Sequence, residues 1–208
     1  MSERTILFSN VDLSSVLYGH EQKMFKEIDG FPPNRIRDED LETLCDHFER
    51  EYKIAVPTLD EKSITVDHED AKIDVRRMPN RFFYDGGAGG HVSGTRYKFF
   101  VPYSGEKELF KCRPSSFNFN PPHAQVNPNE LVLIYTATGQ QEATAIRSQF
   151  DRELGQIKQW LSCIGSDVDM FNGGVRSKAR TRIEMRKKKL EKDRDLASNL
   201  GFPARSKL

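Results

Sequence analysis

The sequence predicts an α+β fold with a mainly antiparallel β-sheet, an N-terminal helix and a long C-terminal helical hairpin. Two observations predict it. Between residues 64 and 138, apolar and polar residues alternate in several short runs, which is typical of half-buried strands. From Gly139 to Gly201 the apolar residues instead lie three and four positions apart, which places one row of side chains on one face of a helix.

Two helices are expected before the sheet. A short helix is predicted near residues 21–28, and Gly30, Pro32 and Pro33 then break the chain. A second helix is predicted from about Asp38 to Tyr52, with Asp38 as its cap, because acidic residues crowd the first turn.

The main strands are expected in three segments, and residues 109–112 and 116–119 are shorter strand candidates. Residues 64–76 read as a β-hairpin with its turn at 67–70, and residues 95–103 read as the next strand. Residues 131–138 (LVLIYTAT) are apolar on both faces, so we place them near the centre of the sheet. The glycine-rich segment 85–94 is expected to be a loop rather than a phosphate-binding loop, because no GK[ST] follows it.

Two helices are expected to close the chain, over residues 140–164 and 167–199. Gly165 is expected to end the first, and Ser166 with Asp169 resembles a capping box for the second. These segments form either a helical hairpin or one long kinked helix. The predicted domains are a body over 1–138, a helical arm over 139–201 and a basic tail over 202–208.

The apolar stripe of the arm is expected to bury against the body or against a second copy of the chain. Each fully buried Leu, Ile or Phe contributes about 1.5–3 kcal/mol, so this stripe should dominate the stability of the arm. It therefore predicts a protein partner or self-association through the hairpin. The predicted interface residues are Ile146, Phe150, Leu154, Ile157, Leu161 and Ile164.

The end of the chain is strongly basic. Residues 176–208 contain twelve Lys and Arg against four Asp and Glu, a net charge of +8, while the whole chain has +1. These cations could contact nucleic-acid phosphates, pair with an acidic protein surface, or form the solvated face of a coiled coil. The candidate nucleic-acid-binding residues are Arg176, Lys178, Arg180, Arg182, Arg186, Lys187, Lys188, Lys189 and Lys192.

The sequence contains no recognisable catalytic signature. A candidate ligand pocket consists of Tyr103, Arg113, His91 and His123, and either histidine could serve a small hydrolase as a general base. Asp60-Glu61-Lys62 and Asp70-Ala71-Lys72 match the short motif of metal-dependent nucleases, but such triplets arise by chance in a chain with 30% charged residues. No HxH, HExxH or CxxC spacing is present, so no metal and no cofactor is expected.

The expected location is the cytoplasm, without membrane association. The N-terminus lacks the basic and apolar regions of a secretory signal, and no run of 18 apolar residues exists. The three cysteines are odd in number and far apart, which favours reduced thiols over a disulfide framework.

Two stretches of the sequence resemble a known family. They are Gly94…Val101-Pro102-Tyr103-Ser104-Gly105…Leu109-Phe110…Arg113-Pro114-Ser115…Asn120-Pro121-Pro122, and Lys188-x-Leu190…Asp193-Arg194-x-Leu196-Ala197-x-x-Leu200-Gly201-Phe202-Pro203. Over about residues 60–205, the chain resembles the N-terminal region of an uncharacterised bacterial family. In that family a restriction-endonuclease-like domain often follows this region, so the resemblance implies no catalytic residue here.

Together these observations favour a non-catalytic regulatory, sensor or assembly module associated with a bacterial nuclease, in a role such as defence against foreign DNA. The alternative is a nucleic-acid-binding protein that uses the basic C-terminal helix.

Overall fold

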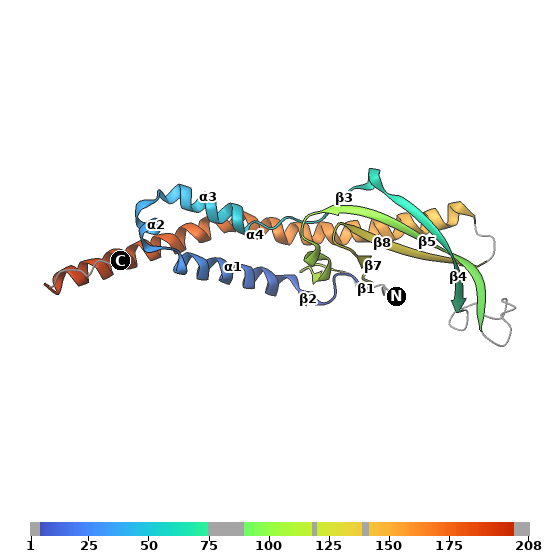
Figure 1. Ribbon diagram of the computed structural model, residues 1–208, viewed down its shortest axis with the longest axis horizontal. Helices are drawn as coiled ribbons and strands as arrows, with labels where there is room; N and C mark the ends of the chain where they lie inside the picture. The colour runs from blue at the N-terminus through green and yellow to red at the C-terminus, as the bar shows by residue number, and fades with distance from the viewer. Residues whose placement is uncertain (1–4, 75–89, 118–119, 139–141, 202–208) are drawn as a thin grey trace. The chain divides into compact units, whose positions relative to one another are not determined.

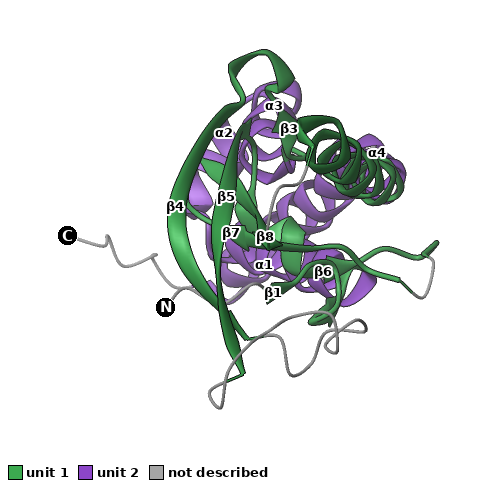
Figure 2. Ribbon diagram, turned by 90° about the vertical axis from the view of Figure 1, so that its right-hand side faces the viewer, with its two compact units in different colours: residues 1–13, 55–165 green, residues 14–54, 166–208 purple. Residues whose placement is uncertain are grey.

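The computed structural model describes residues 5–74, 90–117, 120–138 and 142–201. It confirms the α+β class and the antiparallel sheet. The chain forms two compact units, coloured separately in Figure 2: residues 1–13 with 55–165, and residues 14–54 with 166–208. This grouping differs from the division expected after residue 138, because the first part of the C-terminal helix packs with the sheet.

The first unit contains a six-stranded sheet. The strand order is β1 (Thr5–Ile6), β7 (His123–Val126), β8 (Glu130–Thr138), β5 (His91–Ser104) and β3 (Thr58–Leu59), while β4 (Thr65–Asp74) pairs with the other part of β5. All these pairs are antiparallel. A separate parallel pair joins β2 (Val11–Asp12) to β6 (Cys112–Arg113), and short 3₁₀ turns cover Glu61–Ser63 and Lys107–Lys111.

Strand β8 lies between β7 and β5, which confirms the central position expected for residues 131–138. The hairpin expected at 64–76 is wrong, because β4 runs unbroken through the acidic stretch 67–70 and pairs with β5 over its whole length. The two aspartates of that stretch favour a turn, but pairing with β5 along the whole strand outweighs this preference, and charges are well tolerated on an edge strand. Glu69 pairs there with Arg96 and Lys98 of β5.

Helix α4 (Ala143–Asn199) covers one face of this sheet with its first turns (Figure 1). The rings of Phe150 and Phe99 stack with centroids 4.5 Å apart, and Tyr135 of β8 donates its hydroxyl hydrogen bond to Glu153 at 2.8 Å. All six residues predicted as an interface are buried within the chain. Of the two alternatives for the stripe, packing on the chain's own body is therefore the one observed.

The expected hairpin of helices is also wrong, because α4 continues through Gly165 and Ser166 without interruption. One long helix, the other alternative, is what forms. Ile164 and Val168, on either side of the glycine, are fully buried. Buried apolar residues on both sides stabilise the helix by more than the roughly 1 kcal/mol that an internal glycine costs.

The second unit consists of α1 (Leu13–Gly30), α2 (Pro33–Asp38), α3 (Leu41–Tyr52) and the remainder of α4. Helix α1 is more than twice as long as the segment expected at 21–28. The cap of α3 is Asp40, not Asp38, because Asp38 belongs to α2. The Asp40 carboxylate accepts hydrogen bonds from the backbone N–H groups of Glu42 and Thr43 at 3.0 and 3.2 Å.

Candidate interaction surface on helix α4

The buried face of α4 in the second unit sets the direction of its charged side chains. Val175, Ala179 and Ile183 are fully buried and lie four residues apart. The residues between them therefore project to the two flanks of this buried row. Arg176 and Arg180 project to one flank, toward α3, while the cations of the other flank face α1.

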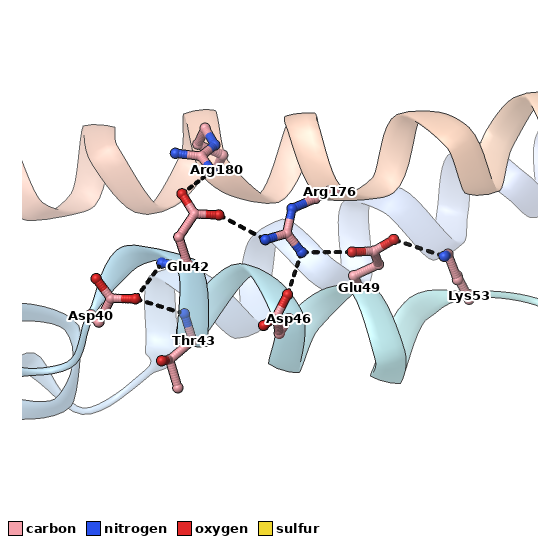
Figure 3. A network of polar contacts seen from close by, with 8 residues as sticks. All are labelled: Asp40, Glu42, Thr43, Asp46, Glu49, Lys53, Arg176 and Arg180. Atoms are coloured by element: carbon pink, nitrogen blue, oxygen red, sulfur yellow. Dashed lines mark hydrogen bonds and ion pairs between the residues drawn. The ribbon is translucent and has the colours of Figure 1, made fainter.

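Arg176 bonds three carboxylates of α3 (Figure 3). Its guanidinium donates to Glu49 at 2.8 Å and to Glu42 at 2.7 Å, and it also pairs with Asp46. Arg180 pairs with Glu42 as well. Glu42, Asp46 and Glu49 are spaced four and three residues apart, so α3 presents them on one face to the two arginines.

These contacts fix the ionisation of the carboxylates. The hydrogen bonds from Arg180 and then Arg176 lower the pKa of Glu42 below its ordinary value. Lys53 and Arg176 do the same for the pKa of Glu49. Both groups are therefore fully anionic at neutral pH, and the network is an array of charge-assisted hydrogen bonds.

The other flank of α4 pairs with α1. Lys178 pairs with Glu21, and Arg182 donates from Nε to Asp29 Oδ1 at 2.9 Å. Further along the helix, Lys187 donates to the backbone carbonyl of Glu39 at 2.9 Å. Five of the nine predicted nucleic-acid-binding residues therefore already have a partner within their own unit, at positions that remain partly exposed.

The remaining cations differ in their surroundings. The Nε atom of Arg186 is buried and has no hydrogen-bond partner. Lys188, Lys189 and Lys192 are exposed, and within the described part of the chain they make no hydrogen bond or ion pair. On the same terminal segment Leu196 is 63% exposed and Leu200 is 65% exposed.

The four residues of the predicted ligand pocket do not form one pocket. Tyr103 is buried and donates its hydroxyl hydrogen bond to the carbonyl of Asn127 at 2.6 Å. Arg113 lies against Asp12, with Nε and Nη2 at 2.8 and 2.6 Å from Oδ1. His91 lies at the opposite end of β5 from Tyr103.

The strand geometry explains why. His91 and Tyr103 are twelve positions apart on β5, and a strand rises at most about 3.4 Å per residue, so they lie near opposite ends of the strand, up to roughly 40 Å apart along it. His123 is an exposed residue of β7 opposite Ile6. The predicted pocket combined residues that are close in the sequence but lie at different ends of the sheet.

The two nuclease-like triplets have structural surroundings of their own. Asp60 caps the turn at Glu61–Ser63 and accepts a hydrogen bond from the Ser63 hydroxyl at 2.6 Å, while Asp70 lies on the edge strand β4. Among the described residues, no group of three His, Cys, Asp or Glu side chains could hold a metal ion. Of the loop expected at 85–94, residues 85–89 lie outside the described residues. Residues 91–94 belong to strand β5, so the loop expectation is wrong for that part.

The described helices include none that is both long enough and apolar enough to cross a lipid bilayer. A scan of the sequence against protein-family models found no match, and searches of curated proteins and of solved structures found no similar protein.

Proposed function

We propose that this chain is a regulatory or assembly module that works with a bacterial nuclease and binds a protein partner through the exposed end of α4. The observation that supports it best is the division of the cations of α4. Five of them, Arg176, Lys178, Arg180, Arg182 and Lys187, join α4 to α1, α3 and the residue after α2, so this part of the helix holds the helices of the unit together. From Lys188 to Asn199, every residue of α4 except Leu190 is exposed.

The composition of the exposed segment favours a protein partner. Lys189, Lys192 and Leu196 are spaced three and four residues apart, so they share one face of the helix, and Leu200 directly follows its last residue, Asn199. Exposed leucines bordered by lysines fit an apolar groove with acidic residues along its rim. A phosphate backbone would use the lysines but would leave both leucines in water.

The nuclease association has a separate basis. It rests on the sequence resemblance alone, in which this region precedes a restriction-endonuclease-like domain. A cytoplasmic location is part of the proposal, and the free thiols of Cys45, Cys112 and Cys163 are compatible with a reducing compartment.

The alternative function is nucleic-acid binding, and one observation favours it. Lys188, Lys189 and Lys192 project from fewer than two turns of the helix and are exposed. If one of these lysines neutralises a DNA phosphate, the slope of log binding constant against log salt concentration should become more negative by roughly 0.9.

A photoreactive benzophenone residue at Leu196 separates the two functions. The full chain carrying it is expressed in its own cells and irradiated, and the cross-linked species are identified by mass spectrometry. The proposal expects a cross-link to a nuclease, absent when the same residue replaces exposed Glu51 on α3. Cross-links to nucleic acid alone, or equal products at both positions, would contradict it.

A further inference from the structure

Arg186 is the cation in this part of α4 that the second unit leaves without a partner. Of the six Lys and Arg side chains from residue 176 to residue 187, the other five bind a carboxylate or a backbone carbonyl of α1, α3 or the residue after α2. The Nε atom of Arg186 is buried and has no acceptor, and among the described residues the guanidinium makes no ion pair. Its charge is therefore not compensated within the described chain.

The sequence around Arg186 explains this isolation. The positions three and four residues away are its neighbours on the helix surface, and they hold Arg182, Ile183, Lys189 and Leu190. None of the four is acidic. Asp29 compensates Arg182, whereas Lys189 has no ion pair in the described part of the chain. Arg186 and Lys189 are therefore two uncompensated cations less than one helical turn apart, and together they attract a carboxylate from outside the chain.

Arg186 lies where the buried part of α4 meets its exposed end. Ile183, three residues earlier, is fully buried, Arg186 itself is half-buried, and the residues from Lys188 to Asn199 are exposed except Leu190. Figure 1 shows these last turns of α4 extending beyond α1 and α2. A half-buried arginine beside an exposed segment has the properties of an interface hot spot, because arginine is enriched at such positions and partial burial strengthens its charge interactions.

Arg186 also shares a face of α4 with the side chains proposed to bind the partner. Lys189 follows Arg186 by three residues and Leu196 follows Lys189 by seven, which is helical spacing. At 1.5 Å per residue, the ten positions from Arg186 to Leu196 span about 15 Å along the helix. A partner that binds both must present a carboxylate on the order of 15 Å from the groove that takes Leu196.

We propose that a carboxylate of the protein partner binds the guanidinium of Arg186, and that this contact helps to determine which partner is recognised. The inference rests on the partner proposed above for the exposed end of α4, and it extends that binding surface back to Arg186. A carboxylate pairs with a guanidinium through two parallel hydrogen bonds, which fix direction as well as charge. A lysine supplies only a point charge, so this contact distinguishes arginine from lysine.

The test uses the full chain with the benzophenone residue at Leu196, expressed in its own cells and irradiated. Arg186→Gln should lower the yield of the protein cross-link at least about fivefold, as expected for loss of a hot-spot arginine. Arg186→Lys keeps the charge but should lower the yield nearly as much. Arg194→Gln removes an exposed cation of the same helix and should leave the yield unchanged.

The outcomes separate this inference from the proposed function. A protein cross-link whose yield Arg186→Gln leaves intact would overturn this inference alone. If the chain that retains Arg186 gives no protein cross-link, the proposed function fails and this inference fails with it. Phosphates also accept paired hydrogen bonds from arginine, so the irradiation is repeated in a cell extract treated with phosphatase and nuclease. The same product is expected, and its loss would assign Arg186 to a phosphate instead.

A melting curve distinguishes partner binding from a structural role of Arg186. The melting temperature of Arg186→Gln should equal or exceed that of wild type, because the substitution breaks no bond within the described chain and removes a buried unpaired group. Arg182→Gln, which breaks the pair with Asp29, should melt lower. A fall for Arg186→Gln as large as that for Arg182→Gln would contradict the proposal.

Discussion

The side chain of Asn172 on α4 bonds both backbone groups of Ile54. Its Oδ1 accepts from the Ile54 N–H, and its Nδ2 donates to the Ile54 carbonyl, each at 3.0 Å. Ile54 follows the last residue of α3, Tyr52, by two positions. The side-chain amide of Asn172 therefore supplies the hydrogen-bond partners that the Ile54 backbone lacks because the helix has ended.

Removing that amide should destabilise the protein. Asn172→Ala leaves the N–H and carbonyl of Ile54 unpaired, and an unsatisfied buried polar group costs about 1–3 kcal/mol. Chemical denaturation measures the loss of unfolding free energy. Asn199→Ala, at the exposed end of α4, is the matched control and should change it by less than about 0.5 kcal/mol. Equal effects of both variants would contradict the account.

Arg176 should stabilise the protein in a pH-dependent way. Its partners Glu42 and Glu49 have lowered pKa values in the folded state, so their contribution is present above the ordinary pKa of 4.5 and is lost as the pH falls through the folded pKa. The melting temperature of Arg176→Gln should lie below that of wild type at pH 7, and the gap should close toward pH 3. Arg194→Gln should match wild type throughout, and a gap that does not change with pH would disprove the network.

Two glycines should respond in opposite directions to alanine. Gly105 has a φ of +97°, and a Cβ there would lie 2.7 Å from the carbonyl oxygen of Val56, so Gly105→Ala should destabilise the fold by more than about 1 kcal/mol. Gly165 lies inside α4 with nothing within 4 Å, so Gly165→Ala should stabilise it by about 0.5–1 kcal/mol. Thermal denaturation measures both. Destabilisation by Gly165→Ala would mean that the chain turns there, as in a hairpin.

The apolar stripe is tested at neighbouring positions. Ile157 is fully buried, and truncation of a buried isoleucine to alanine costs about 2–5 kcal/mol. Lys158 beside it is half-exposed and pairs with Glu61, so Lys158→Ala should cost at most about 1 kcal/mol. If denaturant unfolding finds the two losses alike, the stripe is not the core of the first unit.

Local periodicity predicted much of this fold. The α+β class, the central strand at 131–138 and the buried stripe from Ile146 to Ile164 all followed from which positions are apolar. The hairpin at 64–76 and the break at Gly165 were wrong for one common reason. In both places a residue type that often ends an element lies inside one, because pairing with β5 or packing on both sides outweighs its local preference.

The ion pairs of α4 could not be predicted from local pattern, because their partners lie far away in sequence. Arg176 is separated from Glu49 by 127 residues, and Arg180 from Glu42 by 138. A signal was nevertheless present: α3 places three carboxylates on one face at helical spacing. Matching that acidic face to Arg176 and Arg180 of α4 would have favoured ion pairs within the chain over contact with nucleic acid.

The central claim, that the cations of α4 serve to join helices within the chain, is tested most directly by a charge exchange between Arg182 and Asp29. The melting temperatures of Arg182→Asp, of Asp29→Arg and of the double variant are compared with wild type. The account predicts that both single variants melt lower and that the double variant recovers most of the loss. A double variant whose loss equals the sum of the two single losses would show that the residues do not pair, and would contradict it.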